Sequence, residues 1–492
     1  MTLDGYMRSR LALPAGPTFA ITWGIPDGFG GMTGAMLERS RQFVRLARRD
    51  VHVLTFEPRP DYPALEQSLR DSGAFIDGMR LLNLWDWLRD NPVVPGTVKH
   101  VFTPLAADDA FQSTFRGTTE FTRTRFATDG STPLQVDYYR LDGTLLASDR
   151  RDSREFGVLG GRSVVLCDAT GTPVRSWGTI TSLYRHWLDR LVAARRSLVI
   201  IDSKAMAELF VGYTNPNAMT VHVVHASHLV GTGRPIGPIR ESRSAVFGNL
   251  AGFEAVAVLS DRQREDIDVL LGPQPTVVTV PNGRSFPSYR PTTRERGRGV
   301  IVASLSARKR VGHAIRAVLA TRSAGVTLDV FGDGEERSSL EELAGDRVRL
   351  HGHVLGAGDR FTEFSFVLLT STSEGFPLVL VEAMASGCVP IAYDVPYGPA
   401  DLITDGVTGF LVEPADEDGL AKAIDRFMAL SESDVATMRA AAAATAARFS
   451  DRAVMARWAK LVRSLRIKAV RQRPVPFGAR VVRRLRRTLA RR

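Results

Sequence analysis

The chain has 492 residues, a length that suits two α/β lobes with attachments better than one ordinary core. Hydrophobic and charged contents of 44% and 24% are normal for a soluble globular protein, and no apolar run approaches the roughly 18 residues of a membrane span. The N-terminus lacks a long apolar stretch, and the only cysteines are Cys167 and Cys388. These features predict a cytoplasmic protein without disulfides or a cysteine-rich metal site.

The net charge of +11 is concentrated at the C-terminal end. Residues 463–492 hold 12 of the 64 basic residues and no acidic one, which leaves 52 basic against 53 acidic residues in the body. This near-neutral body argues against nucleic acid as a partner. In the tail, Val481, Val482, Leu485 and Leu489 would form one apolar stripe among arginines. Docking on the anionic inner face of the cell membrane fits this pattern, and a solvated tail or an anionic polymer partner are the alternatives.

The chain opens with a β-α-β pattern, which predicts a parallel sheet. A strand is expected at 19–23, followed by a glycine-rich loop at 24–32, an amphipathic helix and a second strand at 51–56. The sequence pattern changes at about 102–176, where short predicted strands joined by Gly/Asp turns indicate a β-rich antiparallel insertion. Strands of the parallel type return at 197–202, 220–225 and 255–259.

A polar stretch at 281–298 predicts a linker, and a second series of strands alternating with helices begins at 299. Residues 415–447 are strongly helical in composition, and the helix carrying Trp458 and Leu461 comes last before the tail. The predicted fold class is therefore α/β with two Rossmann-like lobes. The boundaries we expect are 1–280 for the N-terminal lobe, 281–298 for the hinge, 299–462 for the C-terminal lobe with its final crossover helix, and 463–492 for the basic tail.

The most informative segment is 373–387, SEGFPLVLVEAMASG. A strand runs into its glycine-bearing loop, and a helix is expected to start near Pro377 and to stop at Gly387. Backbone N–H groups at such a helix start can bind a diphosphate. An ionised Glu382 among apolar neighbours is costly without a partner, and a ribose diol would offset that cost. The plainer alternatives are a solvent-facing Glu382 and a Glu374 that merely favours the helix start.

The spacing of Glu374 and Glu382 resembles the Glu-x7-Glu signature of glycosyltransferase family 4, which has the two-lobed GT-B fold. Residues 397–401 are similar to a narrower branch, the poly(glycerol-phosphate) α-glucosyltransferase-like enzymes of wall teichoic acids, which also carry a β-rich insertion in the first lobe. That branch includes protein O-linked GlcNAc transferases acting on serine-rich adhesins. Further segments that resemble the family are 280–283, 331–334, 351–354 and 405–412.

The resemblance implies roles for individual residues on the donor side. Glu374 would contact the hydroxyls of the transferred sugar, Glu382 the ribose and Lys309 the diphosphate. Val354 would lie at the strand end that reads the base. The rest of the donor loop would bind through Gly375, Phe376, Pro377 and Leu378.

On the acceptor side, Gly31 would belong to the family's glycine loop, and His225 would lie beside the transferred sugar with His228 as its competitor. Residues 260–263 resemble a family turn and are expected to shape the lobe interface. Ser304 departs from the family, which usually has arginine there, so that Arg308 or Arg310 would have to supply the missing charge.

The function implied is a retaining hexosyltransferase that uses UDP-glucose or UDP-N-acetylglucosamine. Its acceptor would be a hydroxyl of a polymeric or lipid-linked polyol-phosphate or another surface glycan. No Asp-x-Asp motif stands where a metal-dependent enzyme needs it, so front-side displacement without a metal or other cofactor is expected, as is activity in EDTA. Alternatives are a protein O-glycosyltransferase, an inactive transferase-like chaperone subunit and an NAD dehydrogenase, whose glycine pattern at 28–34 is out of frame. Self-association through the β-rich insertion is also expected.

Overall fold

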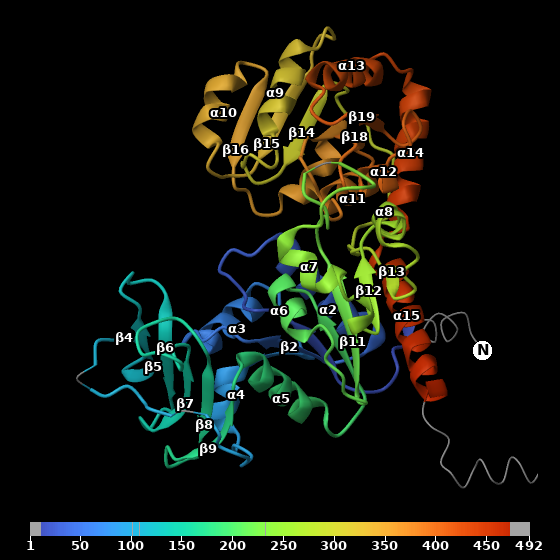
Figure 1. The fold of residues 1–492 in the computed structure, drawn as a ribbon. Helices are drawn as coiled ribbons and strands as arrows, with labels where there is room; N and C mark the ends of the chain where they lie inside the picture. Colours follow the sequence, from blue (N-terminus) through green and yellow to red (C-terminus); the bar gives the residue numbers. More distant parts are fainter. Residues whose placement is uncertain (1–10, 101, 108, 232, 473–492) are drawn as a thin grey trace, which may run out of the picture.

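We describe the protein from a computed structural model, which places residues 11–100, 102–107, 109–231 and 233–472. These residues form three sheets: two parallel sheets covered by helices and one antiparallel sheet set to the side (Figure 1). We call the parts built on them the N-lobe, the C-lobe and the β insertion. Most of the basic tail, residues 473–492, lies outside the described residues.

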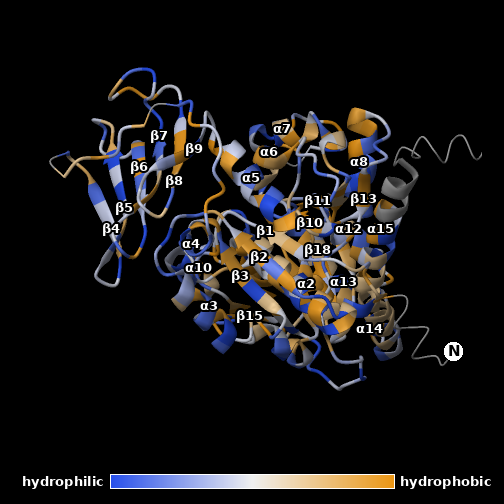
Figure 2. Ribbon diagram, turned by 90° about the horizontal axis from the view of Figure 1, so that it is seen from below, coloured by the Kyte–Doolittle hydropathy of each residue, from blue (hydrophilic) through white to orange (hydrophobic). Residues whose placement is uncertain are grey.

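The N-lobe is built on a parallel sheet with the strand order β13-β12-β11-β10-β1-β2-β3. Its inner strands are buried along their whole length, because helices cover both faces of the sheet. Figure 2 shows these strands as the hydrophobic centre of the lobe. The strands are β1 (Thr18–Ile21), β2 (Val51–Thr55), β3 (Met79–Asn83), β10 (Ser197–Ile201), β11 (Ala218–Val224), β12 (Ala255–Val258) and β13 (Val277–Thr279). The helices are α2 (Gly31–Ala47), α3 (Tyr62–Asp71), α4 (Leu84–Asp90), α5 (Ile180–Val192), α6 (Lys204–Phe210), α7 (Glu241–Phe247) and α8 (Asp261–Leu271).

The β insertion lies between α4 and α5 and forms an antiparallel sheet whose strands follow one another in chain order. Trp85 of α4 stacks on Tyr138 with ring centroids 3.6 Å apart, and Arg89 donates to the Tyr139 carbonyl at 2.8 Å. These contacts fix the sheet to the N-lobe. Its strands are β4 (Gln112–Arg116), β5 (Thr119–Phe126), β6 (Pro133–Tyr139), β7 (Leu145–Arg150), β8 (Ser163–Cys167) and β9 (Pro173–Trp177).

The C-lobe repeats the doubly wound pattern with a parallel sheet in the order β16-β15-β14-β17-β18-β19. The order changes direction at β14, whose neighbours are β15 and β17, and ligands of such sheets bind at this point, beyond the carboxyl ends of the strands. The strands are β14 (Arg298–Val302), β15 (Thr327–Phe331), β16 (Val348–Gly352), β17 (Phe366–Leu369), β18 (Val389–Tyr393) and β19 (Phe410–Val412). The helices are α9 (Val311–Ala320), α10 (Arg337–Ala344), α11 (Leu378–Ala385), α12 (Pro399–Leu402), α13 (Glu417–Met428), α14 (Glu432–Ala447) and α15 (Asp451–Gln472).

The last helices connect the two lobes. Figure 1 shows α14 beside the C-lobe and α15 returning along the N-lobe. Helix α15 packs on α2, where Trp458 meets Phe43 edge to face with ring centroids 5.7 Å apart. The hinge segment runs beside the junction of α14 and α15. The Arg284 N–H donates to the Phe449 carbonyl at 3.1 Å, and the Arg284 carbonyl accepts from Asp451 N–H at 3.2 Å.

A second contact between the lobes is made by polar groups. Asp401 accepts hydrogen bonds from the backbone N–H groups of Asp261 and Arg262, at 2.8 and 3.3 Å. The Tyr397 hydroxyl donates to Asp266 at 2.9 Å, and Arg262 pairs with Asp394 at 2.5 Å. Residues 260–263 therefore lie at the lobe interface, as their sequence predicted, and residues 397–401 lie opposite them.

The fold class predicted from the sequence is confirmed: two parallel α/β lobes with an antiparallel β insertion in the first. The helical stretch predicted at 415–447 is two helices, α13 and α14, with a break between them. Within the described ranges, no helix combines the length and the apolar character that crossing a membrane requires.

Candidate active site

The C-lobe side of the site is the loop between β17 and α11. Glu374 is fixed there by its backbone, which donates to the Pro396 carbonyl at 2.8 Å and accepts from Tyr397 N–H at 2.7 Å. Its carboxylate accepts a hydrogen bond from the Lys309 ammonium at 2.6 Å, and the Arg308 guanidinium lies 3.6 Å away. Only 12% of the Glu374 side chain is exposed, so this ion pair is shielded from water and holds both groups in place.

The loop ends at the start of α11, where a helix has backbone N–H groups without partners inside the helix. The helix starts near Pro377 as predicted, with the proline just before the first helical residue, Leu378. Gly398 presses on this proline, because a Cβ there would lie 2.3 Å from Pro377 Cδ. The interface segment 397–401 thus supports the loop from behind. At the helix start Leu378 N–H donates to the Phe376 carbonyl and Leu380 N–H to the Pro377 carbonyl, both at 3.0 Å. An anion there would therefore be favoured mainly by the positive end of the helix dipole.

Glu382 lies within α11 and pairs with Arg284 of the hinge, with 2.5 Å between Arg284 Nε and Glu382 Oε1. Burial raises the pKa of Glu382 above its usual value, and the ion pair with Arg284 acts in the opposite direction. An ionised Glu382 among apolar neighbours needs a partner, and in the structure that partner is the Arg284 guanidinium.

On the N-lobe side, His225 follows β11 and is held by a buried carboxylate. His225 Nε2 lies 2.7 Å from Asp202 Oδ1, and Arg39 of α2 binds the same carboxylate through two hydrogen bonds of 2.8 and 2.6 Å. Burial acts to raise the pKa of Asp202, but Arg39 and His225 outweigh it and hold that pKa well below its usual range. Asp202 is therefore a carboxylate at neutral pH and orients the imidazole.

The competing histidine, His228, has a different environment. Its ring is stacked between Phe247 and Tyr397, with centroids 5.1 and 5.8 Å away, and burial lowers its pKa to about 4. Among the described residues, neither of its ring nitrogens has a hydrogen-bond partner. His228 is part of the packing between the lobes, whereas His225 lines the cavity.

The two lobes approach most closely where Gly375 meets His225. A Cβ on Gly375 would lie 1.9 Å from the His225 carbonyl oxygen, so no larger residue fits while the lobes keep this distance. At Gly30 and Gly31, at the start of α2, a Cβ would have no neighbouring atom within 4 Å, and both glycines face open space. The first glycine brings backbones together, and the other two leave room for a ligand.

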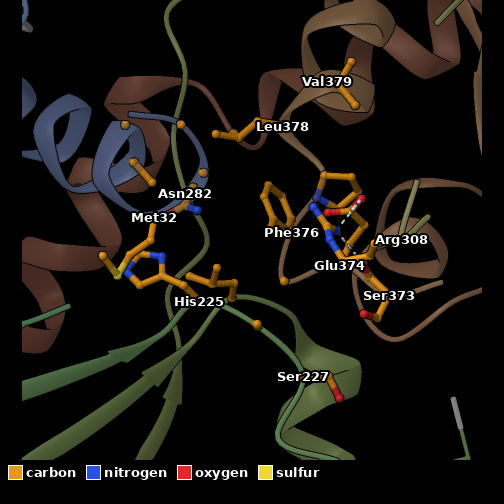
Figure 3. Close-up of a pocket in the computed structure, with 18 of the residues that line it drawn as sticks. Met32, His225, Ser227, Asn282, Arg308, Ser373, Glu374, Phe376, Leu378 and Val379 are labelled. Carbon is orange, nitrogen blue, oxygen red and sulfur yellow. Dashed lines mark hydrogen bonds and ion pairs between the residues drawn. The ribbon is translucent and has the colours of Figure 1, made fainter. Parts of the chain in front are cut away.

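Between the lobes lies a cavity of about 650 Å³ that both sides line. Figure 3 shows His225 and Met32 on one side and Ser373 and Glu374 on the other, with Phe376 between them. Of the predicted site residues, the cavity gathers His225, Lys309, Gly31, Glu374, Glu382 and 375–378.

Val354 instead lines a neighbouring cavity of about 550 Å³. The two cavities share Arg284, Val302 and Glu382, so the Arg284–Glu382 ion pair stands at their junction. A nucleotide whose base lies near Val354 and whose sugar lies near Glu374 would run through both.

Several residues at the site were missed by sequence reasoning. Of the two candidates for the charge missing at Ser304, Arg308 lines the cavity, and Arg310 is not among the described residues that line it. Arg284 was not singled out, and its position directly after the family-like segment 280–283 was the available signal. Asp202, which orients His225, and Arg39, which binds Asp202, were also missed, because they come from other parts of the chain. The cavity also takes three cations from the N-lobe: Lys204, Arg240 and Arg243.

Comparison with known proteins agrees with this geometry. Residues 297–429 match the family described as glycosyl transferases group 1. This segment is a group 1 glycosyltransferase domain. It contains β14 to β19 and the loop with Glu374, so the candidate donor side belongs to the matched region.

Two curated relatives and one solved structure extend the comparison. The chain is 26% identical over 261 residues to the poly(glycerol-phosphate) alpha-glucosyltransferase of Bacillus subtilis (strain 168), which is 50% of this chain and 38% of that protein. It is 30% identical over 301 residues to the GtfA subunit of a UDP-N-acetylglucosamine–peptide N-acetylglucosaminyltransferase from Streptococcus pneumoniae serotype 4, which is 56% of this chain and 59% of that protein. The match therefore spans less than two thirds of either relative.

The fold comparison covers more of the chain. A structure of S. aureus TarM, in complex with Fondaparinux, alpha-GlcNAc-glycerol and UDP, superposes with a TM-score of 0.72 over 91% of this chain and 100% of that one, at 18% sequence identity. At this identity the likeness shows the GT-B fold.

Proposed function

We propose that the protein is a retaining glycosyltransferase that moves a hexose from a UDP-sugar to a hydroxyl of a polyol-phosphate polymer. The observation that carries this proposal is the cavity between the lobes, where the Lys309–Glu374 pair faces His225 with its Asp202 support. Lys309 and the start of α11 suit a diphosphate leaving group, and Glu374 suits the hydroxyls of a sugar.

The reaction we propose has one displacement step. The bond between the sugar C1 and the β-phosphate oxygen breaks, and the acceptor oxygen forms its bond to C1 on the same face. The leaving phosphate oxygen takes the acceptor proton, so the protein needs no general base of its own. Lys309 stabilises the negative charge that develops on the diphosphate. The C-lobe and N-lobe sides of the cavity hold donor and acceptor at reacting distance.

The names of similar proteins support the donor and the stereochemistry. The B. subtilis relative is named an alpha-glucosyltransferase, and the S. aureus structure contains UDP and alpha-GlcNAc-glycerol. Because the common UDP-hexoses are α-linked, an α product means retention. A UDP-glucose or UDP-N-acetylglucosamine donor is therefore our choice for this chain.

The direct test is turnover of the purified chain with a panel of UDP-, GDP- and ADP-sugars, in EDTA and with added Mg²⁺. We expect release of UDP from one UDP-hexose, equal rates in both conditions and a loss of turnover in Glu374→Ala. A requirement for metal would contradict the mechanism. Absence of turnover with every sugar nucleotide would favour a transferase-like subunit that supports an active partner.

A protein acceptor is the second candidate, and the similarity to the GtfA subunit favours it. In that case a serine-rich peptide would be glycosylated and a polyol-phosphate would not. Mass spectrometry of both acceptors after incubation with the preferred donor separates the two candidates.

A further inference from the structure

The N-lobe side of the cavity carries a group of three cationic side chains. Lys204 begins α6, Arg240 immediately precedes α7 and Arg243 lies in its first turn. The two helices pack on one another (Figure 1). All three residues line the same cavity as His225.

Arg243 is the most informative member of the group. It is buried, with 9% relative exposure, yet among the described residues its guanidinium has no hydrogen bond and no carboxylate partner. Burial and the nearby charge of Arg240 lower the pKa of Arg243 to about 10. None of its guanidinium nitrogens is among the fully buried polar atoms without a partner, so the group opens into the cavity that Arg243 lines. A largely enclosed guanidinium with no partner in the described chain is placed to receive an anion from the cavity.

The carboxylates near this group cannot serve as that partner. Asp202, two residues before Lys204, has both oxygens engaged by Arg39 and one also by His225. Glu241 lies between Arg240 and Ser242 in sequence, but it is exposed and is not among the described residues that line the cavity. The carboxylates that do line it are Glu374 and Glu382, both on the C-lobe side and both paired.

The positive charge of the cavity lining exceeds what the diphosphate of a sugar-nucleotide donor needs. Its described lining holds two carboxylates and six cations: Lys204, Arg240, Arg243, Arg284, Arg308 and Lys309. The diphosphate of a nucleotide sugar carries one charge on each phosphate, and it has Lys309, Arg308 and the start of α11 on the C-lobe side. The N-lobe cations therefore remain for a different anion.

We propose that Lys204, Arg240 and Arg243 form an acceptor subsite that binds a phosphate group adjacent to the hydroxyl that is glycosylated. The inference rests on the proposed function and deepens it, because it makes a charged acceptor a requirement of this chain. Phosphate is the expected ligand because three cations on one wall can each donate a charge-assisted hydrogen bond to its oxygens. A neutral peptide hydroxyl would leave Arg243 without an anionic partner.

The experiment compares a glycerol-phosphate oligomer, unphosphorylated glycerol and a serine-rich peptide as acceptors, with the preferred UDP-sugar held at saturation. Wild type is expected to prefer the oligomer. Arg243→Gln and Lys204→Gln should each lower kcat/KM for the oligomer by about tenfold or more and leave the rate with glycerol unchanged. UDP affinity, measured by calorimetry, should stay the same. Lys422→Gln, an exposed lysine on α13, is the control and should behave as wild type.

Each other result overturns the inference in a recognisable way. Equal losses with charged and neutral acceptors would mean that the cations only shape the lobe. A loss of UDP affinity would assign them to the donor, and a wild-type preference for the peptide would remove the need for phosphate. If Arg243→Gln fails to fold, Lys204→Gln still decides the question, because Lys204 is exposed. If wild type neither binds UDP nor releases it from any sugar nucleotide, the proposed function itself is wrong.

Discussion

The two sides of the cavity differ in how their charged side chains are paired. On the C-lobe side both carboxylates have a cationic partner, Lys309 for Glu374 and Arg284 for Glu382. On the N-lobe side Arg243 is buried without a carboxylate, and the buried Asp202 is already occupied by Arg39. Paired groups keep their geometry before a ligand arrives and exchange partners when it enters, whereas unpaired cations gain their first partner from the ligand.

The largest effect that tests this comparison is expected at Lys309. Lys309→Gln should lower kcat by about a thousandfold, because it removes the shielded cation of the C-lobe side, whose side chain is 16% exposed, and leaves Glu374 without its main partner. The matched control is Arg308→Gln, since Arg308 lies 3.6 Å from the same carboxylate but has a side chain 51% exposed. Its effect should stay below about tenfold. Similar losses in both variants, measured by UDP release, would show that the C-lobe charge is shared rather than carried by the shielded pair.

A somewhat smaller effect is expected where the two sides touch. Gly375→Ala puts a Cβ 1.9 Å from the His225 carbonyl, so the lobes must separate or the loop must shift. We expect kcat to fall by about a hundredfold, with a smaller change in affinity for UDP, because a displacement near 1 Å is enough to misalign donor and acceptor. Gly160→Ala in the β insertion, where the nearest atoms are 4.0 Å away, is the control. Wild-type turnover in Gly375→Ala would mean that the reacting state has the lobes further apart.

The part of the site that could be predicted from the sequence is the part that is local in the chain. Glu374, the helix start and Glu382 lie within one strand-loop-helix segment, whose glycines and proline indicate its shape. The N-lobe charges could not be predicted, because Arg39 and Asp202 are 163 residues apart and Arg243 differs from other surface arginines only through its burial. Doubly wound lobes follow from alternating strands and helices, but which loops meet across the cavity depends on how two lobes pack.

A moderate effect is expected for the support of His225. Asp202→Asn keeps the size of the side chain but removes the charge that orients the imidazole and pairs with Arg39. We expect kcat to fall about tenfold to a hundredfold, and the melting temperature to drop because Arg39 becomes a buried unpaired cation. Arg41→Gln, which removes a cation that pairs on α2 with Glu38, serves as the stability control. If Asp202→Asn loses stability but keeps full turnover, the network is structural only.

The smallest effect concerns Asp451, at the start of α15, whose backbone N–H donates to the carbonyl of the cavity-lining Arg284. Burial raises the pKa of Asp451 to about 6, and the charge of Glu38 adds to this rise. A carboxyl whose pKa is higher in the folded than in the unfolded protein binds more protons when folded, so its contribution to stability is greatest below about pH 4 and declines as the pH rises to about 6. Asp451→Asn should therefore raise the melting temperature at about pH 7.5, and this gain should disappear near pH 4.

Gln42, which donates to Asp451 at 2.6 Å, can still donate to the amide oxygen, so turnover should stay within about twofold of wild type. A gain that is equal at both pH values would show that the charge of Asp451 is not its cause, and a large loss of turnover would place Asp451 among the groups that set the spacing of the two sides.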